Sequence, residues 1–176
     1  IGASSSSNVT GTDNTTVGHS SGRDVEGNSN TALGLNAGRN VRGNTNSAIG
    51  SGAGNNVQGN NNLAWGIEAG QNLGQYGTNG TGAFNNIHIG SRSGQNTQGS
   101  RNAVTGWESG RNVTGNNNIV HGSQAGNTVS GNFNSASGYY SGTGVSGNYN
   151  VASGHTSGAT TSVAAATSHW AIVRAH

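Results

Sequence analysis

The sequence predicts an all-β protein, a parallel β-roll (β-solenoid) of about ten 16-residue coils. Three observations point to this fold class: a fixed sixteen-residue period, Gly at fixed points of that period, and few large apolar side chains. The chain has 176 residues, of which 33 are Gly and 7% are charged, and it contains no Pro, Cys or Met. Such a composition often indicates disorder, but Val, Ile, Leu and Trp recur too regularly here for a flexible linker.

The repeat has the consensus GxxNxAxGxxAGxxVx, as in GNSNTALGLNAGRNVR (27–42) and GNTNSAIGSGAGNNVQ (43–58). Nine repeats cover residues 11–74 and 83–162, and residues 1–10 match the back part of another. Asn fills position 4 of all nine repeats, and Gly fills positions 8 and 12. This period is too short for a pair of helices and too rich in Gly for either one, whereas it suits two short strands and two turns per coil.

Stacked coils place one position of the repeat above itself every ~4.8 Å, so each position forms a column. We expect the Asn column at position 4 to form an amide ladder, in which each side chain bonds to its copies above and below. This is a structural role for Asn rather than a ligand-binding one. Two apolar columns are expected beside the ladder: position 15 (Val25, Val41, Val57, Leu73, Val113, Val129, Val145) and position 6 (Ala32, Ala48, Ala64, Val104, Val120, Ala136, Ala152).

The distribution of charged residues along the repeat indicates that the predicted strands carry no charge on either face. Within the nine repeats Asp, Glu and Arg occur only at positions 3, 10, 13, 14 and 16, so positions 4 to 9 carry no charge. Along a strand, positions 4 and 6 point to one side while positions 5 and 7 point to the other. A strand with two uncharged faces is usually covered on both, so we expect copies of the chain to pack together along positions 5 and 7. The interface residues are then Leu33, Ile49, Trp65 and Ile89.

The units NTALGLNAG, NSAIGSGAG and NLAWGIEAG resemble the NSxAxG-type repeats of the head domains of YadA-like trimeric autotransporter adhesins, the BpaA type of head among them. The resemblance spans about residues 1–162. It implies a left-handed roll, a homotrimer, and exposure on the bacterial cell surface, with a stalk and an outer-membrane anchor outside this chain. The implied function is non-enzymatic attachment to host cells or extracellular matrix, through a matrix protein, a cell-surface receptor or a glycan. The repeat is longer here than is usual in that family, which leaves the ligand open.

Residues suited to catalysis or metal binding are few and dispersed. The five acidic residues form no pair suited to glycoside hydrolysis, and the six His residues have no partner at metal-ligand spacing. We therefore expect no catalytic residue, no metal and no cofactor, although an enzyme built on a β-solenoid is a third class of function. The basic residues are scattered, which argues against nucleic acid as a partner. The chain shows neither an export signal nor an apolar run of membrane-spanning length, so a membrane is expected only through an external anchor.

Aromatic side chains gather late in the chain and are the candidate ligand-binding residues. They are Trp107, Tyr139 and Tyr140 at positions 9 and 10, and Phe133 and Tyr149 at position 3. Phe133 and Tyr149 belong to adjacent coils, so their rings can stack. Contact with a protein or sugar ligand explains such a patch, and so does packing between copies of the chain.

Two other interpretations of the whole chain stay open. A trimeric phage tail fibre or spike segment would share the same roll, and genomic context would separate it from an adhesin. An ice-binding face would need a continuous Thr column, which Thr15 and Thr31 begin but do not continue.

The domain organisation follows from the repeat. One roll domain is predicted over residues 1–162, with QYGTNGTG (75–82) inserted as a loop that is either a ligand contact or tolerated decoration. The repeat resumes in register after it, with Asn86 at position 4, so the insertion has to leave the stack. Residues 163–176 break the repeat, because Trp170 stands where Gly is expected at position 8, and form an end cap, the start of a neck or a tail.

Overall fold

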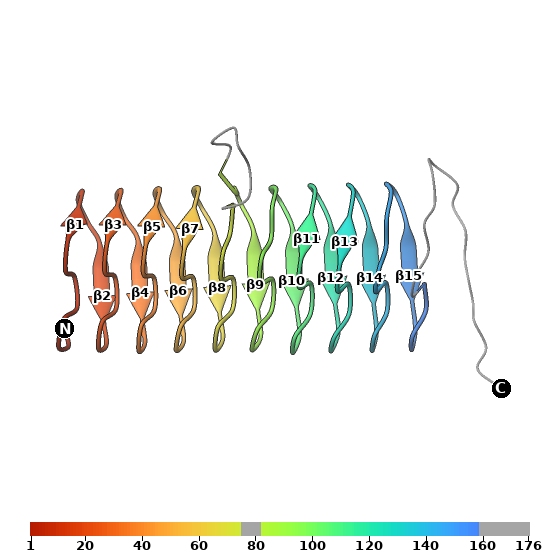
Figure 1. Ribbon diagram of the computed structural model, residues 1–176, viewed down its shortest axis with the longest axis horizontal. Coiled ribbons are helices and arrows are strands. Elements are labelled where there is room, and N and C mark those ends of the chain that lie inside the picture. Colours follow the sequence, from red (N-terminus) through yellow and green to blue (C-terminus); the bar gives the residue numbers. More distant parts are fainter. Residues whose placement is uncertain (75–81, 159–176) are drawn as a thin grey trace.

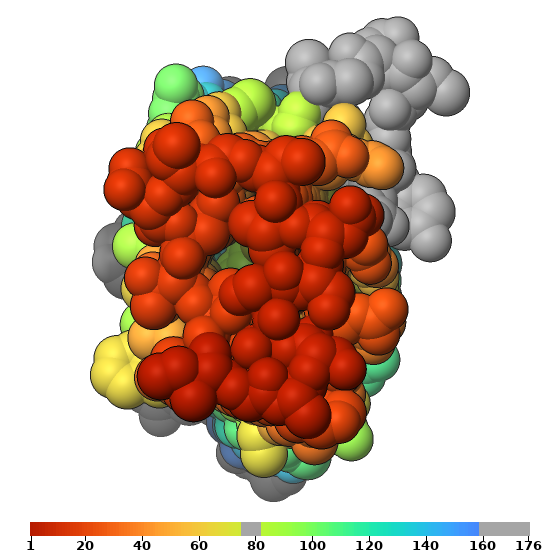
Figure 2. All heavy atoms as spheres, turned by 90° about the vertical axis from the view of Figure 1, so that its left-hand side faces the viewer, coloured from red at the N-terminus to blue at the C-terminus, as the bar shows by residue number. Residues whose placement is uncertain are grey.

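The computed structural model describes residues 1–74 and 82–158, which form an all-β parallel solenoid of about nine turns. Figure 1 shows the turns stacked side by side along one long axis, from β1 at the N-terminal end to β15 at the far end. Figure 2 looks along that axis onto the first turns, behind which the later turns lie nearly in line. The all-β parallel solenoid predicted from the repeat is therefore confirmed, while residues 75–81 of the insertion and the segment 163–176 lie outside the described residues.

Each coil contributes a three-residue strand at positions 5 to 7, and nine of these strands pair in parallel as one sheet. They are β2 (Thr15–Val17), β4 (Thr31–Leu33), β6 (Ser47–Ile49), β8 (Leu63–Trp65), β9 (Ile87–Ile89), β10 (Ala103–Thr105), β12 (Ile119–His121), β14 (Ser135–Ser137) and β15 (Val151–Ser153). Two-residue strands at positions 15 and 16 form two smaller parallel sheets. The first sheet holds β1 (Val9–Thr10), β3 (Val25–Glu26), β5 (Val41–Arg42) and β7 (Val57–Gln58), and the second holds β11 (Val113–Thr114) and β13 (Val129–Ser130).

The strands pair so that each residue faces the same position of the neighbouring repeat. Ala48 pairs with Ala64, sixteen residues later, and Ala64 pairs with His88, across the insertion. The predicted register after the insertion is thus confirmed. The residues that flank it also keep the regular bonds of the stack, since Gly74 N–H donates to the Thr97 carbonyl at 3.0 Å and Ala83 N–H donates to the Gln58 carbonyl at 2.8 Å.

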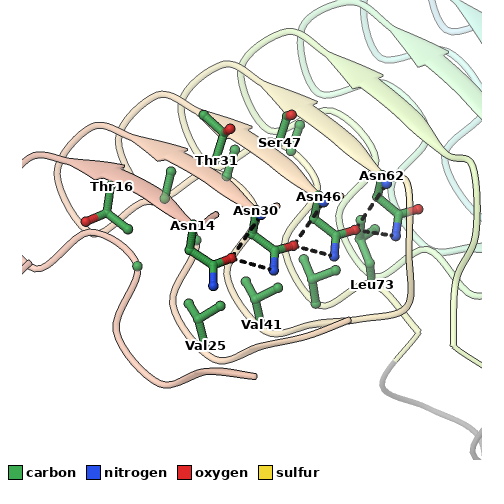
Figure 3. A pocket seen from close by; sticks show the side chains of 17 residues that line it. Asn14, Thr16, Val25, Asn30, Thr31, Val41, Asn46, Ser47, Asn62 and Leu73 are labelled. Atoms are coloured by element: carbon green, nitrogen blue, oxygen red, sulfur yellow. Dashed lines mark hydrogen bonds between the residues drawn. The ribbon is translucent and has the colours of Figure 1, made fainter. Parts of the chain in front are cut away.

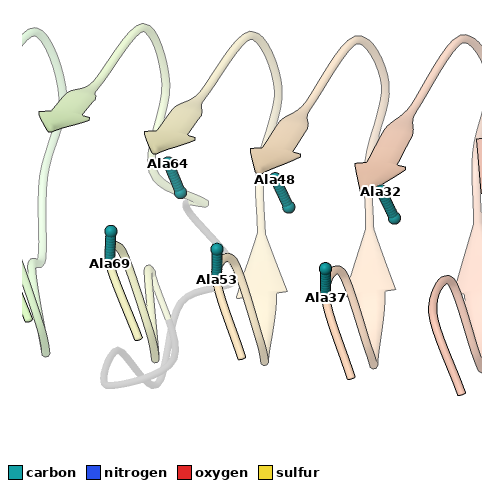
Figure 4. Packing of buried hydrophobic residues seen from close by; sticks show 6 residues of the cluster. All are labelled: Ala32, Ala37, Ala48, Ala53, Ala64 and Ala69. Atoms are coloured by element: carbon teal, nitrogen blue, oxygen red, sulfur yellow. The ribbon is translucent and has the colours of Figure 1, made fainter. Parts of the chain in front are cut away.

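Four positions of each coil point into the roll: 4, 6, 11 and 15. Figure 4 shows two of these columns, with the position 6 residues Ala32, Ala48 and Ala64 facing the position 11 residues Ala37, Ala53 and Ala69 across the interior. Position 11 holds only Ala or Ser, and all nine of these residues are buried. Such small side chains bring the two walls of the coil close together, and the core between Asn14 and Leu73 leaves a cavity of only ≈ 20 Å³.

The turns depend on residues in the left-handed region. In the coil 43–58 six residues have positive φ: Gly43, Thr45, Gly50, Gly52, Gly54 and Asn56. At positions 1 and 8 the neighbouring coil also comes very close. A Cβ atom on Gly43 would lie 2.0 Å from the carbonyl oxygen of Gly59, and one on Gly50 would lie 2.5 Å from that of Gly66. Gly is therefore strongly favoured there: it fills position 8 of every repeat and position 1 of every repeat except that of residues 83–98, where Ala83 stands.

The predicted Asn ladder is confirmed, and it runs through the interior beside the Val column (Figure 3). Asn46 is typical: its Nδ2 donates to Asn30 Oδ1 at 3.1 Å and to the Gly59 carbonyl at 2.8 Å. Its Oδ1 accepts from the backbone N–H of Asn62 at 3.1 Å and from Asn62 Nδ2 at 3.0 Å. Every polar group of this buried amide is therefore paired, and the ladder links the turn of each coil to its neighbours.

Replacing Asn46 with Ala should lower the free energy of unfolding by roughly 2–5 kcal/mol, because buried groups of Gly59 and Asn62 lose their partners. Asn44 provides a matched control, since its Oδ1 makes a similar contact with the Asn28 N–H at 2.7 Å but on the exposed surface. Asn44→Ala should change the stability by less than about 1 kcal/mol, because water replaces the amide. Urea denaturation of both variants measures the difference, and equal effects would contradict a special role for the inner ladder.

Deleting residues 75–82 should leave the fold and its melting temperature close to those of the parent chain. A Cβ atom on Gly74 would lie 2.7 Å from Ala83 N, so the two ends already lie within reach of one peptide bond. Circular dichroism and thermal melting test this directly. A deletion variant that fails to fold would show that the segment belongs to the core.

Candidate functional site

The outward face of the nine-stranded sheet is apolar over its N-terminal half. Positions 5 and 7 alternate with the buried positions 4 and 6, as predicted, and point away from the core. Leu33, Trp65 and Ile89 keep 44%, 55% and 37% of their surface exposed in the single chain, and Ile49 is half-buried. These four are the predicted interface residues, and the structure places them all on this one face.

Position 9, two residues beyond each three-residue strand, is exposed or half-buried in every coil, an orientation that the sequence left undecided. Leu35, Ile67, Trp107 and Tyr139 occupy it and are about half exposed. Toward the C-terminal end the sheet face becomes polar, where Thr105 Oγ1 and His121 Nδ1 share a hydrogen bond of 2.6 Å. Exposed apolar side chains on this face are thus more frequent between residues 27 and 98, while Ile119 and Val151 continue the face beyond them with 57% and 56% of their surface exposed.

The five candidate ligand-binding aromatic residues fall into two groups instead of one patch. Phe133 and Tyr149 stack with ring centroids 5.0 Å apart and an interplanar angle of 2°, which confirms the predicted stacking. Tyr139 packs edge-on against Tyr140 at 4.6 Å, and it also lies 5.1 Å from the ring of His155. The first pair precedes the three-residue strands and the second group follows them, so a strand separates the two groups. Trp107 lies two coils before Tyr139 in the same column and is 49% exposed.

Three of these aromatic residues have an unfavourable backbone conformation. Phe133, Tyr140 and Tyr149 have φ values of 57°, 54° and 61°, in the left-handed region that bulky residues avoid. Positions 3 and 10 are left-handed in the other coils too, where they hold mainly polar residues, such as Asn61 and Asn117 at position 3 and Glu68 at position 10. Left-handed backbone is thus a feature of every coil, and the last coils differ in placing aromatic side chains on it.

A ladder of charges runs along position 10. Arg92 bridges Glu68 and Glu108 at 3.1 Å each, from the coil between them. The hydrogen bond from Arg92 holds the pKa of Glu108 below its ordinary value, and these two carboxylates raise the pKa of Arg92. Gln124 also donates to Glu108 at 3.2 Å. Every acid of the ladder is thus paired with a donor, an arrangement that stabilises the stack and leaves no free acid–base pair.

His88 occupies position 6, one of the interior columns. The alternation of the strand predicts that position 6 points inward, but a titratable residue in this column was not expected. It is 0% exposed, and burial lowers its pKa to about 3 from the ordinary 6.5. Within residues 1–74 and 82–158, no three His, Asp or Glu side chains group closely enough to hold a metal ion. The signal for His88 was present in the sequence as the one His in a column of Ala, Val and Thr.

The surface hollows of the roll are polar and lie between positions 14 and 16. One has a volume of ≈ 420 Å³ and is lined by Asn8, Asp24, Glu26, Asn40, Arg42 and Asn56. Another, of ≈ 270 Å³, is lined by Asn96, Gln98, Asn112 and Thr114. Amide ladders form their floor, such as Asn40 Nδ2 to Asn56 Oδ1 at 2.8 Å, so these polar groups are already occupied with one another.

The fold and the site define an all-β solenoid with an apolar outer sheet face and exposed aromatic groups. Models of protein families, curated proteins and solved structures give no match to the chain. In the part of the chain that the structure describes, no helix has the length and apolarity needed to cross a membrane.

Proposed function

We propose that this chain is the head module of a bacterial cell-surface adhesin, a non-enzymatic homotrimer that attaches to host cells or extracellular matrix. The observation that carries the proposal is the uncharged, apolar outward face of the nine-stranded sheet. The resemblance of the repeats to heads of YadA-like trimeric autotransporter adhesins supplies the number of copies, the left-handed roll and the outer-membrane location.

The occupant of the sheet face is a second and a third copy of the same chain. A thin roll buries little apolar surface of its own, since its interior consists mainly of Ala, Val, Ser and Asn. Trp65, Ile87 and Ile89 lie on adjacent coils of the outward face and keep 55%, 43% and 37% of their surface exposed. Complete burial of an exposed side chain of this kind supplies roughly 1.5–3 kcal/mol, so these three, already about half buried, would supply roughly half of that each. Packing between copies thus provides the burial that the single roll lacks.

The ligand contact is assigned to the aromatic groups of the last coils. Phe133 and Tyr149 are 49% and 57% exposed, although each ring packs against the other. A left-handed backbone favours Asn over an aromatic residue, so the backbone conformation does not explain why Phe133 and Tyr149 occupy these positions. A contact outside the chain, with a matrix protein, a receptor or a glycan, explains why aromatic residues occupy these positions.

Ile49→Asp should prevent trimer assembly, because it would bury a carboxylate without a partner at an apolar interface. The expected loss of assembly free energy is on the order of several kcal/mol per chain. Gln58→Asp is the control: it adds the same charge at position 16, where Glu26 and Arg42 already occur. Light scattering and native mass spectrometry should show a trimer for the parent and the control, and monomer for Ile49→Asp. A folded monomeric parent would overturn the trimer.

The ligand role is tested with substitutions taken from the chain's own columns. Phe133→Asn and Tyr149→Asn match Asn61 and Asn117 at position 3. Tyr139→Ser and Trp107→Ser match Ser123 at position 9, and Tyr140→Gln matches Gln124 at position 10. Each should leave the stability within about 1 kcal/mol of the parent. At Phe133, Tyr140 and Tyr149 relief of the left-handed backbone offsets the loss of ring contacts, and Trp107 and Tyr139 are about half exposed.

The parent should bind at least one member of a panel of matrix proteins and glycans, and the variant with all five changes should bind it at least tenfold more weakly. Unchanged binding by that variant would remove the aromatic groups from the contact. A parent that binds nothing on the panel would count against the adhesin itself.

A further inference from the structure

The coil formed by residues 83–98 differs from every other coil in its interior. Its four inward side chains are Asn86, His88, Ser93 and Thr97, all polar and all 0% exposed. In each other coil whose four inward positions are described, position 15 is Val or Leu, as in Leu73 and Val113 on either side. None of its four inward positions therefore contributes an aliphatic side chain, and its one buried apolar residue is Ala83, at the first position of the coil.

Most of the unpaired polar atoms of the interior also belong to this coil. Among the described residues, four buried side-chain atoms have no hydrogen-bond partner: Arg39 Nε, His88 Nδ1, His88 Nε2 and Ser93 Oγ. Three of the four belong to this coil. The imidazole ring is tightly enclosed, since a Cβ atom on Gly94 would lie 2.1 Å from its Cδ2 and one on Gly70 would lie 3.1 Å from its Nδ1. Each unpaired buried group destabilises the closed coil, because it has given up its hydrogen bonds to water without gaining a partner.

The hydrophobic core and the smaller sheets both divide at the same place. Two apolar clusters end at Ala69 and Ala83 on one side, and two others begin at Val104 and Val113 on the other. The two-residue strands form one sheet from β1 to β7 and a separate sheet from β11 to β13. Among the described residues only single bridges, from Val57 to Leu73 and from Gln98 to Thr114, lie between them, whereas the nine-stranded sheet continues through β9. The roll thus consists of two apolar stacks joined through one polar coil. In a solenoid each coil touches only its neighbours, so such a coil can open while both stacks stay folded.

We propose that the coil 83–98 is an acid-sensitive opening point, at which protonation of His88 separates the roll into two stacks. A charged imidazolium has no acceptor in the closed coil, because both ring nitrogens lack a partner there. His88 lies between Ala64 and Val104 in its column, and Gly70 and Gly94 lie against its ring; none of these residues titrates. Opening exposes the ring to water, where it can hold the proton.

Charged groups near this coil lie on its outer surface and balance one another. Arg92, next to Ser93 in the sequence, pairs outward with Glu68 and Glu108 on the two neighbouring coils. The hydrogen bond from Arg92 holds the pKa of Glu108 below its ordinary value, so protonation of that acid does not account for a change between pH 6.5 and 5.

The direction of the pH effect follows from the two states of His88. Above pH 6.5 the ring is neutral in the closed and the opened coil, so closing does not depend on pH. Below pH 6.5 the opened coil binds a proton that the closed coil excludes down to about pH 3. The population of the opened coil should therefore rise by close to tenfold per pH unit across this window.

Hydrogen–deuterium exchange of the intact chain, corrected for the intrinsic rate at each pH, tests the proposal. Between pH 6 and pH 4 the protection of amides in residues 83–98 should fall by roughly 70-fold, while residues 27–74 and 99–146 keep theirs. His88→Val should abolish this dependence, since Val104 and Val120 already occupy the same column. His88→Ala serves the same purpose if Val does not fit, because Ala64 and Ala136 fill the column as well.

Ser93→Ala is the matched control, since position 11 holds Ala in the coils that contain Ala53 and Ala69. It removes an unpaired hydroxyl but leaves His88 in place, so it should raise the protection at every pH and keep the tenfold slope. A His88→Val chain with the parent's pH dependence would overturn the proposal. Equal loss of protection along the whole roll at acidic pH would also overturn it, because the opening would then be global.

Discussion

Stacking of identical positions by backbone hydrogen bonds is the constraint on which the whole structure depends. Each residue faces its counterpart in the next repeat, as Ala48 faces Ala64, so one side chain per coil becomes a continuous column. A column is stable only if identical side chains on adjacent coils can pack against or bond to one another. Asn meets this requirement best in the interior, because an amide both donates to and accepts from an identical amide. Gly at positions 1 and 8 meets it differently, by letting the backbone of adjacent coils approach within a distance that excludes a side chain.

The same constraint explains how much of the fold could be predicted from the sequence. Positions 4 to 7 form a regular strand, so strict alternation assigned Asn46 and Ala48 to the interior and Ile49 to the exterior. The register across the insertion followed from the repeat alone. Alternation fails between positions 8 and 14, where left-handed residues reverse the chain several times. Position 11 was therefore missed as a core column, although its restriction to Ala and Ser is a signal of tight packing. The exposed amide ladders, such as Asn40 with Asn56, were missed for the same reason.

The candidate site was predictable only in part. The repeat identified which residues depart from their columns, and Phe133, Tyr149 and His88 all stand out in this way. The distance between two such residues depends on the path of the chain through the turns, and the repeat pattern does not predict that path. Sequence proximity of Phe133 and Tyr139 thus suggested one patch, whereas positions 3 and 9 lie on opposite sides of a strand. His88 needed the interior geometry to show that its ring nitrogens lack partners.

The in-register columns also fix the spacing between side chains on the outer surface. Side chains displayed at one position of different coils are separated by whole multiples of about 4.8 Å, as the 5.0 Å between the Phe133 and Tyr149 rings illustrates. Adding or removing one complete repeat shifts everything beyond it by a single unit and leaves the local structure of each coil unchanged. Distances between surface groups can therefore evolve in fixed steps, independently of the residues that maintain the core. A lineage carrying this roll can match the spacing of a multivalent target by changing the number of repeats alone.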